Sequence, residues 1–125
     1  MCIRDRLADQ STEVGEFLSE VRFASRPLTL KVIIESGELQ TPELIAQATR
    51  LALAAGADFV KTSTGKTPTG ATPAAAAVML KEIQASGLPS AGFKASGGVR
   101  SVADAAGYIA PVSYTHLTLP TNREV

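Results

Sequence analysis

Two lysines in this chain stand at the ends of short apolar runs. Lys61 follows Phe59 and Val60, and Lys94 follows Phe93. An ammonium group among apolar side chains is costly, and desolvation favours the neutral amine, which is the nucleophilic form. A neutral lysine amine can attack a carbonyl carbon and form a Schiff base. The two positions therefore predict covalent amine chemistry on a carbonyl substrate.

The pair predicts more than either lysine alone. An isolated lysine amine is almost wholly protonated at neutral pH. A neighbouring ammonium disfavours a second positive charge, so Lys94 is expected to keep Lys61 neutral and nucleophilic, and to shuttle protons. A solvated lysine at a strand end is the simpler interpretation of Lys61 taken alone, and the equivalent position of Lys94 reverses that preference.

Glycines and cations that suit an anion follow both lysines. Gly65 and Lys66 offer exposed backbone and a positive charge. Gly97 and Gly98 precede a predicted helix, where backbone N–H groups can approach a phosphate closely, and Arg100 adds charge. The sequence therefore predicts a phosphate site, and the alternative is that these glycines serve only as turns.

Other candidates carry weaker signals. Lys31 enters early in its strand and either lines the pocket or sits at its rim, and Thr62 is a further candidate for the pocket. Glu35 is either a partner of a lysine or an ordinary strand-end carboxylate, and we favour the second. Neither His116 nor Cys2 is assigned a role. We expect no metal and no cofactor, since no metal-ligand spacing occurs.

Strand and helix patterns alternate through the middle of the chain. Strands are expected at residues 29–35, 58–62 and 92–95, the first of them buried, with a loop at residues 36–38. Val14, Phe17, Leu18 and Val21 recur at helical spacing until Arg26-Pro27.

Two further helices begin at Thr-Pro pairs, with Thr41 and Thr72 as N-caps, and end near Gly56 and Gly87. A last helix begins near Ser101, whose spacing to Asp104 is that of a capping box.

The connections are too long for hairpins, so the strands should be parallel, with helices as right-handed crossovers. Two units nearly repeat, 41–61 and 72–94, each running Thr-Pro, helix, Gly, strand, Lys. Equivalent positions on adjacent parallel strands lie side by side. Lys61 and Lys94 should therefore project into the same space at the C-terminal ends of the strands.

Composition excludes several classes of protein. The chain has 125 residues, with 12 basic and 12 acidic side chains and 45% hydrophobic residues, which fits one globular domain and argues against general binding of nucleic acid or a membrane surface. No apolar run approaches a membrane span of about 18 residues. One cysteine allows no internal disulfide, so a cytoplasmic setting is expected.

The two ends continue no strand–helix pattern. Residues 1–6 and 112–125 resemble translated sequencing-adapter DNA, so we expect a non-native leader, a native segment at 7–111 and a non-native tail.

Three motifs together resemble the C-terminal half of the deoxyribose-phosphate aldolase family: residues 30–39 (LKVIIESGEL), 59–66 (FVKTSTGK) and 92–100 (GFKASGGVR). The resemblance implies an α/β fold that is part of a TIM (β/α)8 barrel, with three to four βα units and parallel strands. It implies a metal-free class I aldolase that cleaves 2-deoxy-D-ribose 5-phosphate into glyceraldehyde 3-phosphate and acetaldehyde. Lys61 would be the Schiff-base lysine and Lys94 the second active-site lysine.

The same resemblance implies that the first half of the barrel, with a catalytic aspartate, and the final strand with its phosphate loop are missing here. We therefore expect weak activity at best from this fragment, and an oligomer only in a full-length parent. The alternatives are another Schiff-base aldolase of phosphosugars, a transaldolase-like barrel, or a truncated product without catalysis. We expect a small phosphorylated sugar as the partner.

Overall fold

The computed structural model describes residues 11–112. The predicted leader at 1–6, the tail from residue 113 onward, Cys2 and His116 lie outside these residues. Among the described helices, none is long and apolar enough to cross a membrane.

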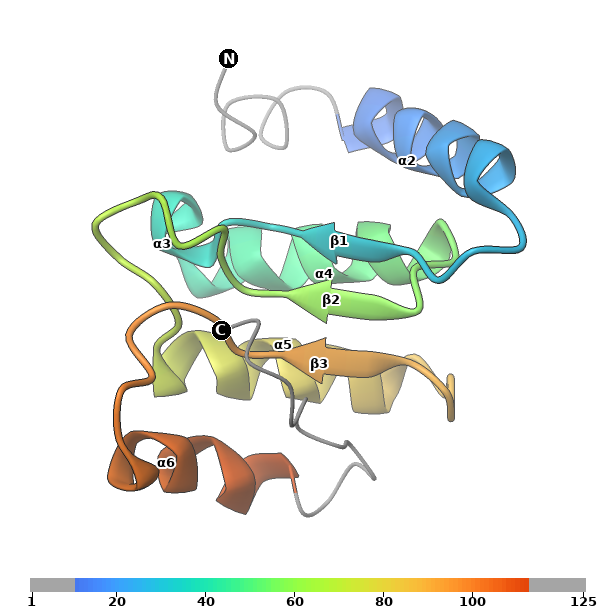
Figure 1. The fold of residues 1–125 in the computed structure, drawn as a ribbon. Coiled ribbons are helices and arrows are strands. Elements are labelled where there is room, and N and C mark those ends of the chain that lie inside the picture. The colour runs from blue at the N-terminus through green and yellow to red at the C-terminus, as the bar shows by residue number, and fades with distance from the viewer. Residues whose placement is uncertain (1–10, 113–125) are drawn as a thin grey trace.

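Strands and helices alternate as expected (Figure 1). The three strands form one parallel sheet in the order β1-β2-β3, so the predicted pairing is confirmed. Each strand is shorter than expected. The described elements are α2 Ser11–Ser25, β1 Lys31–Ile33, α3 Ser36–Leu39, α4 Pro42–Ala54, β2 Phe59–Lys61, α5 Pro73–Ala85, β3 Gly92–Lys94 and α6 Val102–Val112.

Local signals fix the ends of the two central helices. The hydroxyls of Thr41 and Thr72 each accept the N–H of the residue three positions on, at 3.3 and 3.1 Å. A proline occupies the first turn of both helices. Gly56 and Gly87 follow the helices with φ of 96° and 68°, a region that favours glycine. The predicted caps and stops are confirmed.

Two expectations about the first strand and its loop are wrong. The predicted loop at 36–38 is the one-turn helix α3, bracketed by Glu35 and Gln40 at φ of 51° and 66°. The predicted buried strand is not fully buried, because Lys31 is exposed and the other two residues of β1 are only partly buried. A lysine side chain keeps its charged end in solvent unless it is paired.

Helices α4 and α5 cover one face of the sheet (Figure 1). Val60 and Phe93 are 0% and 1% exposed and form part of the core. Because side chains alternate along a strand, the residues on either side of Val60 and Phe93 lie on the opposite face. That opposite face carries both Lys61 and Lys94.

The outermost helices, α2 and α6, expose large apolar side chains. Phe17, which shares the predicted apolar spacing of its helix, is 62% exposed, and Phe23 is 83% exposed. On α6, Val102 and Ile109 are 88% and 50% exposed. The central helices α4 and α5 have none of the large exposed apolar residues, and the remaining two, Leu28 and Leu88, lie in loops.

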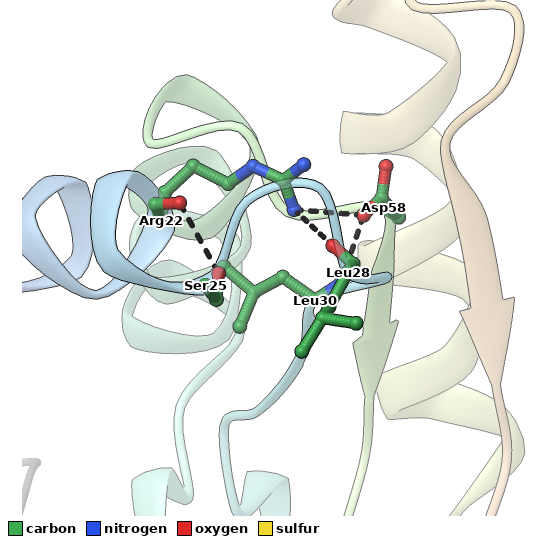
Figure 2. Close-up of polar contacts among 5 residues, drawn as sticks. All are labelled: Arg22, Ser25, Leu28, Leu30 and Asp58. Atoms are coloured by element: carbon green, nitrogen blue, oxygen red, sulfur yellow. Dashed lines mark hydrogen bonds and ion pairs between the residues drawn. The ribbon is translucent and has the colours of Figure 1, made fainter.

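A polar cluster ties α2 to the amino ends of the strands (Figure 2). The Arg22 guanidinium pairs with Asp58 at 2.9 Å and donates to the carbonyl of Leu28 at 3.2 Å. Asp58 also accepts the N–H of Leu30 at 2.8 Å. One carboxylate therefore connects α2, β1 and β2 at the end of the sheet opposite to Lys61 and Lys94.

Replacing Asp58 with alanine is expected to lower the free energy of unfolding by about 1–2 kcal/mol, because it orphans the Leu30 N–H and breaks a half-exposed ion pair. Urea unfolding of the chain, with Glu13→Ala on the surface of α2 as the control, measures the difference. Equal stability of the two variants would contradict a structural role for this cluster.

Candidate active site

The two lysines occupy paired positions on neighbouring strands. Lys61 is the last residue of β2 and Lys94 the last of β3, and the sheet register pairs them directly. Paired positions on parallel strands point their side chains to the same face, with strands about 4.8 Å apart. The predicted juxtaposition of the two positions is confirmed.

The two lysines differ in burial. Lys94 is 4% exposed, whereas Lys61 is half-buried. From the sequence we expect Lys61 to be the desolvated lysine, whereas the structure buries its neighbour more deeply. Of the two lysines, Lys61 is the more accessible to solvent.

Lys31 lies on the same face of the sheet as Lys61 and Lys94, two residues nearer the amino ends of the strands. It pairs with Phe59, two residues before Lys61, and is exposed. The Phe59 ring covers Gly92, where any Cβ would clash with it. Lys31 and the two strand-end lysines thus form two successive layers about 6–7 Å apart along the strands.

Thr62 makes a contact that its sequence position did not indicate. Its side chain is fully buried, and its hydroxyl accepts the N–H of Ser96 at 3.0 Å and donates to the Ser96 carbonyl at 3.2 Å. These two bonds hold the segments after β2 and β3 together. Ser63 next to it is also buried, and its hydroxyl has no hydrogen-bond partner among the described residues.

The two predicted phosphate segments are brought together by close backbone approach. A Cβ on Gly70 would lie 2.6 Å from the Gly97 oxygen, and one on Gly97 would lie 3.9 Å from the Cα of Gly65. The Ala71 N–H donates to the carbonyls of Ser96 and Gly97 at 2.9 and 3.1 Å. No side chain fits at Gly70, whereas a Cβ at Gly65 would meet nothing within 4 Å.

The residues predicted to bind phosphate lie in the loops that follow β2 and β3, which we call the loop layer. Gly65 has φ of 86° and, like Lys66, is exposed. Gly97 and Gly98 both have φ of 81°, and Gly98 is exposed. Glycine adopts such positive φ values readily, and it leaves the backbone N–H groups open to a close approach.

The start of α6 is already occupied by the chain's own carboxylate. Asp104 accepts the N–H groups of Arg100 and Ser101 at 3.0 and 3.1 Å, and donates its own N–H to the Ser101 hydroxyl at 3.1 Å. The predicted capping box is confirmed. Arg100 can therefore meet a phosphate through its exposed side chain, and not through its N–H.

The same contacts lower the pKa of Asp104 below its usual 3.8, chiefly through the Arg100 N–H and then the Ser101 hydroxyl. A lowered pKa means that the capping contribution to stability is present above pH 3.8 and is lost as pH falls through the lower folded value. We expect the Asp104 carboxyl carbon and the two amides to titrate together by NMR with a midpoint below 3.8. A midpoint at or above 3.8 would overturn this.

Glu35 fits neither interpretation made from the sequence. Its carboxylate accepts hydrogen bonds from Thr64 and Thr67 in the loop after β2. Sequence reasoning missed this contact and the Thr62–Ser96 contact, since each joins residues about 30 positions apart. Within residues 11–112, no group of three His, Cys, Asp or Glu side chains could hold a metal ion.

Comparison with known proteins gives one consistent family. A protein-family profile described as DeoC/LacD family aldolase matches residues 2–110. A deoxyribose-phosphate aldolase of Agrobacterium fabrum is 45% identical over 107 residues, covering 85% of this chain.

Solved structures agree with the sequence matches. A Toxoplasma gondii protein provisionally assigned as a deoxyribose-phosphate aldolase superposes with a TM-score of 0.78 at 29% identity, over 90% of this chain and 44% of that one. A Coccidioides immitis protein with the same provisional assignment gives 0.77 at 34% identity, over 86% of this chain and 42% of that one. The predicted partial TIM barrel is confirmed, and the chain spans 41% of the Agrobacterium relative's length.

Proposed function

Because the chain belongs to the DeoC/LacD family of aldolases, we propose that it forms the Schiff-base part of a class I aldolase acting on 2-deoxy-D-ribose 5-phosphate. The observation that carries this proposal is the direct pairing of Lys61 with Lys94 at the C-terminal ends of β2 and β3. Active sites of TIM barrels lie at that end of the strands. We further propose that the protein is located in the cytoplasm.

In the proposed reaction, the neutral Lys61 amine attacks C1 of the open-chain sugar, and loss of water gives an iminium. A base takes the proton of the 3-hydroxyl, the C2–C3 bond breaks, and its electrons move to the iminium to give an enamine and glyceraldehyde 3-phosphate. Protonation at C2 and hydrolysis release acetaldehyde and restore Lys61. Lys94 would relay protons beside the covalent intermediate.

The phosphate of the substrate would lie on the loop layer. Lys66 and the exposed side chain of Arg100 supply positive charge, and the Gly97-Gly98 turn supplies backbone N–H groups. Lys31 would line the same face one layer deeper. Thr62 would act by holding the two loops together.

A chimaera tests the proposal: the Agrobacterium fabrum aldolase with its aligned residues replaced by those of this chain. We expect it to cleave 2-deoxy-D-ribose 5-phosphate and, in reverse, to prefer acetaldehyde over ketone donors. Preference for a ketone donor would instead indicate a different phosphosugar aldolase. A folded chimaera with no aldol activity would contradict the proposal.

A further inference from the structure

Glu35 connects the end of β1 to the loop that follows the reactive lysine. One carboxylate oxygen accepts the N–H of Thr64 at 3.0 Å and its hydroxyl at 2.7 Å. The other lies 3.0 Å from the Thr67 hydroxyl, whose single proton is also within reach of the Thr69 carbonyl at 3.1 Å. A single side chain therefore holds both ends of the segment 64–67, which contains Lys66.

The backbone at Glu35 has an unusual conformation, with φ of 51° and ψ of 62°. A residue other than glycine rarely adopts this left-handed conformation, and it persists only where the surroundings enforce it. Here the neighbouring amides do so: Ile34 N–H donates to the Lys61 carbonyl at 3.0 Å and Ser36 N–H to the Thr62 carbonyl at 2.8 Å. Glu35 is thus fixed directly against the end of β2.

A relay runs from this carboxylate to the backbone of Lys66. The Thr64 hydroxyl has one proton, which it gives to Glu35, so its lone pairs are left to accept the Lys66 N–H at 3.1 Å. Between them Gly65 turns through φ of 86°. The negative charge of Glu35 therefore determines the direction of the Thr64 hydroxyl and, through it, the course of the turn.

Three donors on one carboxylate also bear on the choice of glutamate beside a predicted anion site. Hydrogen bonds from neutral donors stabilise the negative charge of Glu35 without cancelling it, and they direct its oxygens at Thr64 and Thr67. A glutamine could keep these contacts only as weaker neutral hydrogen bonds, with its oxygen on Thr64 and its NH2 group on the Thr67 hydroxyl. Glutamate is therefore the side chain that makes the contacts charge-assisted.

We propose that Glu35 is a positioning residue, which holds the 64–67 loop in the conformation that presents Lys66 to the phosphate of the substrate. The identity of the ligand rests on the proposed function above, and the positioning itself does not. Glu35 does not touch the reacting carbon in this account.

Amide hydrogen exchange, measured by NMR on the chain itself, tests the positioning. In Glu35→Gln we expect the Thr64 and Lys66 amides to exchange about tenfold faster, because charge-assisted hydrogen bonds are replaced by weaker neutral ones. The amides of Val60 and Phe93 should keep their rates. Glu38→Gln, on the neighbouring helix α3, is the matched control and should leave all four amides unchanged.

Wild-type exchange rates at Thr64 and Lys66 in a folded Glu35→Gln chain would overturn the proposal. Should Glu35→Gln fail to fold, Thr64→Val replaces it, since it removes only the hydroxyl of the relay. Thr64→Val should accelerate exchange of the Lys66 amide and spare that of Phe93. An unchanged Lys66 amide in Thr64→Val would also overturn the proposal.

Kinetics of the chimaera separate positioning from general stability. Glu35→Gln should raise KM for 2-deoxy-D-ribose 5-phosphate about tenfold, and change kcat and the turnover of unphosphorylated 2-deoxyribose far less. Equal losses with both sugars would contradict positioning of the phosphate loop. An inactive unsubstituted chimaera would contradict the proposed function, and hydrogen exchange would then decide the role of Glu35.

Discussion

Replacing Lys61 with arginine is expected to reduce turnover of 2-deoxy-D-ribose 5-phosphate by the chimaera about 10⁴-fold or more, because the covalent intermediate can no longer form. A guanidinium remains protonated at any accessible pH and cannot attack a carbonyl. Arginine is similar to lysine in length, so the end of β2 stays filled while the nucleophilic amine is lost. The measurement is kcat by coupled detection of glyceraldehyde 3-phosphate.

The matched control for this substitution is Lys81→Arg on the exposed side of α5. That variant should retain wild-type kcat. Turnover within tenfold of wild type in Lys61→Arg would show that another amine forms the intermediate.

The second large effect is expected at Lys94. Replacing it with methionine, which has a similar length and fits a site 4% exposed, should lower kcat by about 10²–10³-fold. The loss combines two causes: a charged group beside Lys61 is removed, and a proton donor and acceptor disappears. Single-turnover kinetics of imine formation and of cleavage report the two causes separately.

Lys94→Arg distinguishes charge from proton transfer. It keeps the positive charge beside Lys61, so it should restore the rate of imine formation relative to Lys94→Met while leaving cleavage slow. Equal rates of imine formation in Lys94→Met and wild type would contradict the electrostatic role of Lys94.

Local rules explain why much of the fold could be predicted from the sequence. Thr41 and Thr72 each precede a proline, and a capping hydroxyl with a proline at the first helical position needs no distant partner to act. The units 41–61 and 72–94 nearly repeat the same pattern, and each ends on a lysine. Because equivalent positions of adjacent parallel strands lie side by side, Lys61 pairs with Lys94. Local patterns thus sufficed for the order of elements and the main pair of residues.

Strand lengths and the helix α3 could not be predicted in the same way. The apolar run 29–35 extends beyond β1, which stops at Ile33 because Glu35 leaves the extended conformation for φ of 51°. That change depends on contacts with the end of β2. A four-residue helix is also too short to show a helical period in the sequence.

The loop layer depends on contacts between residues distant in the sequence. Gly70 packs on Gly97, and Thr62 bonds to Ser96. Glu35 reaches Thr64 across 29 positions. No periodicity or spacing encodes such pairs, so the sequence indicated glycines suited to an anion without showing why their backbones must touch.

Reductive trapping on this chain tests the central claim, which is that the half-buried Lys61 beside Lys94 is the amine that captures an aldehyde. The chain is incubated with acetaldehyde, reduced with borohydride and mapped by peptide mass spectrometry. We predict one ethyl group at Lys61, well ahead of the exposed Lys31, Lys66 and Lys81. Ethylation spread over the exposed lysines, with Lys61 unmodified, would contradict the account.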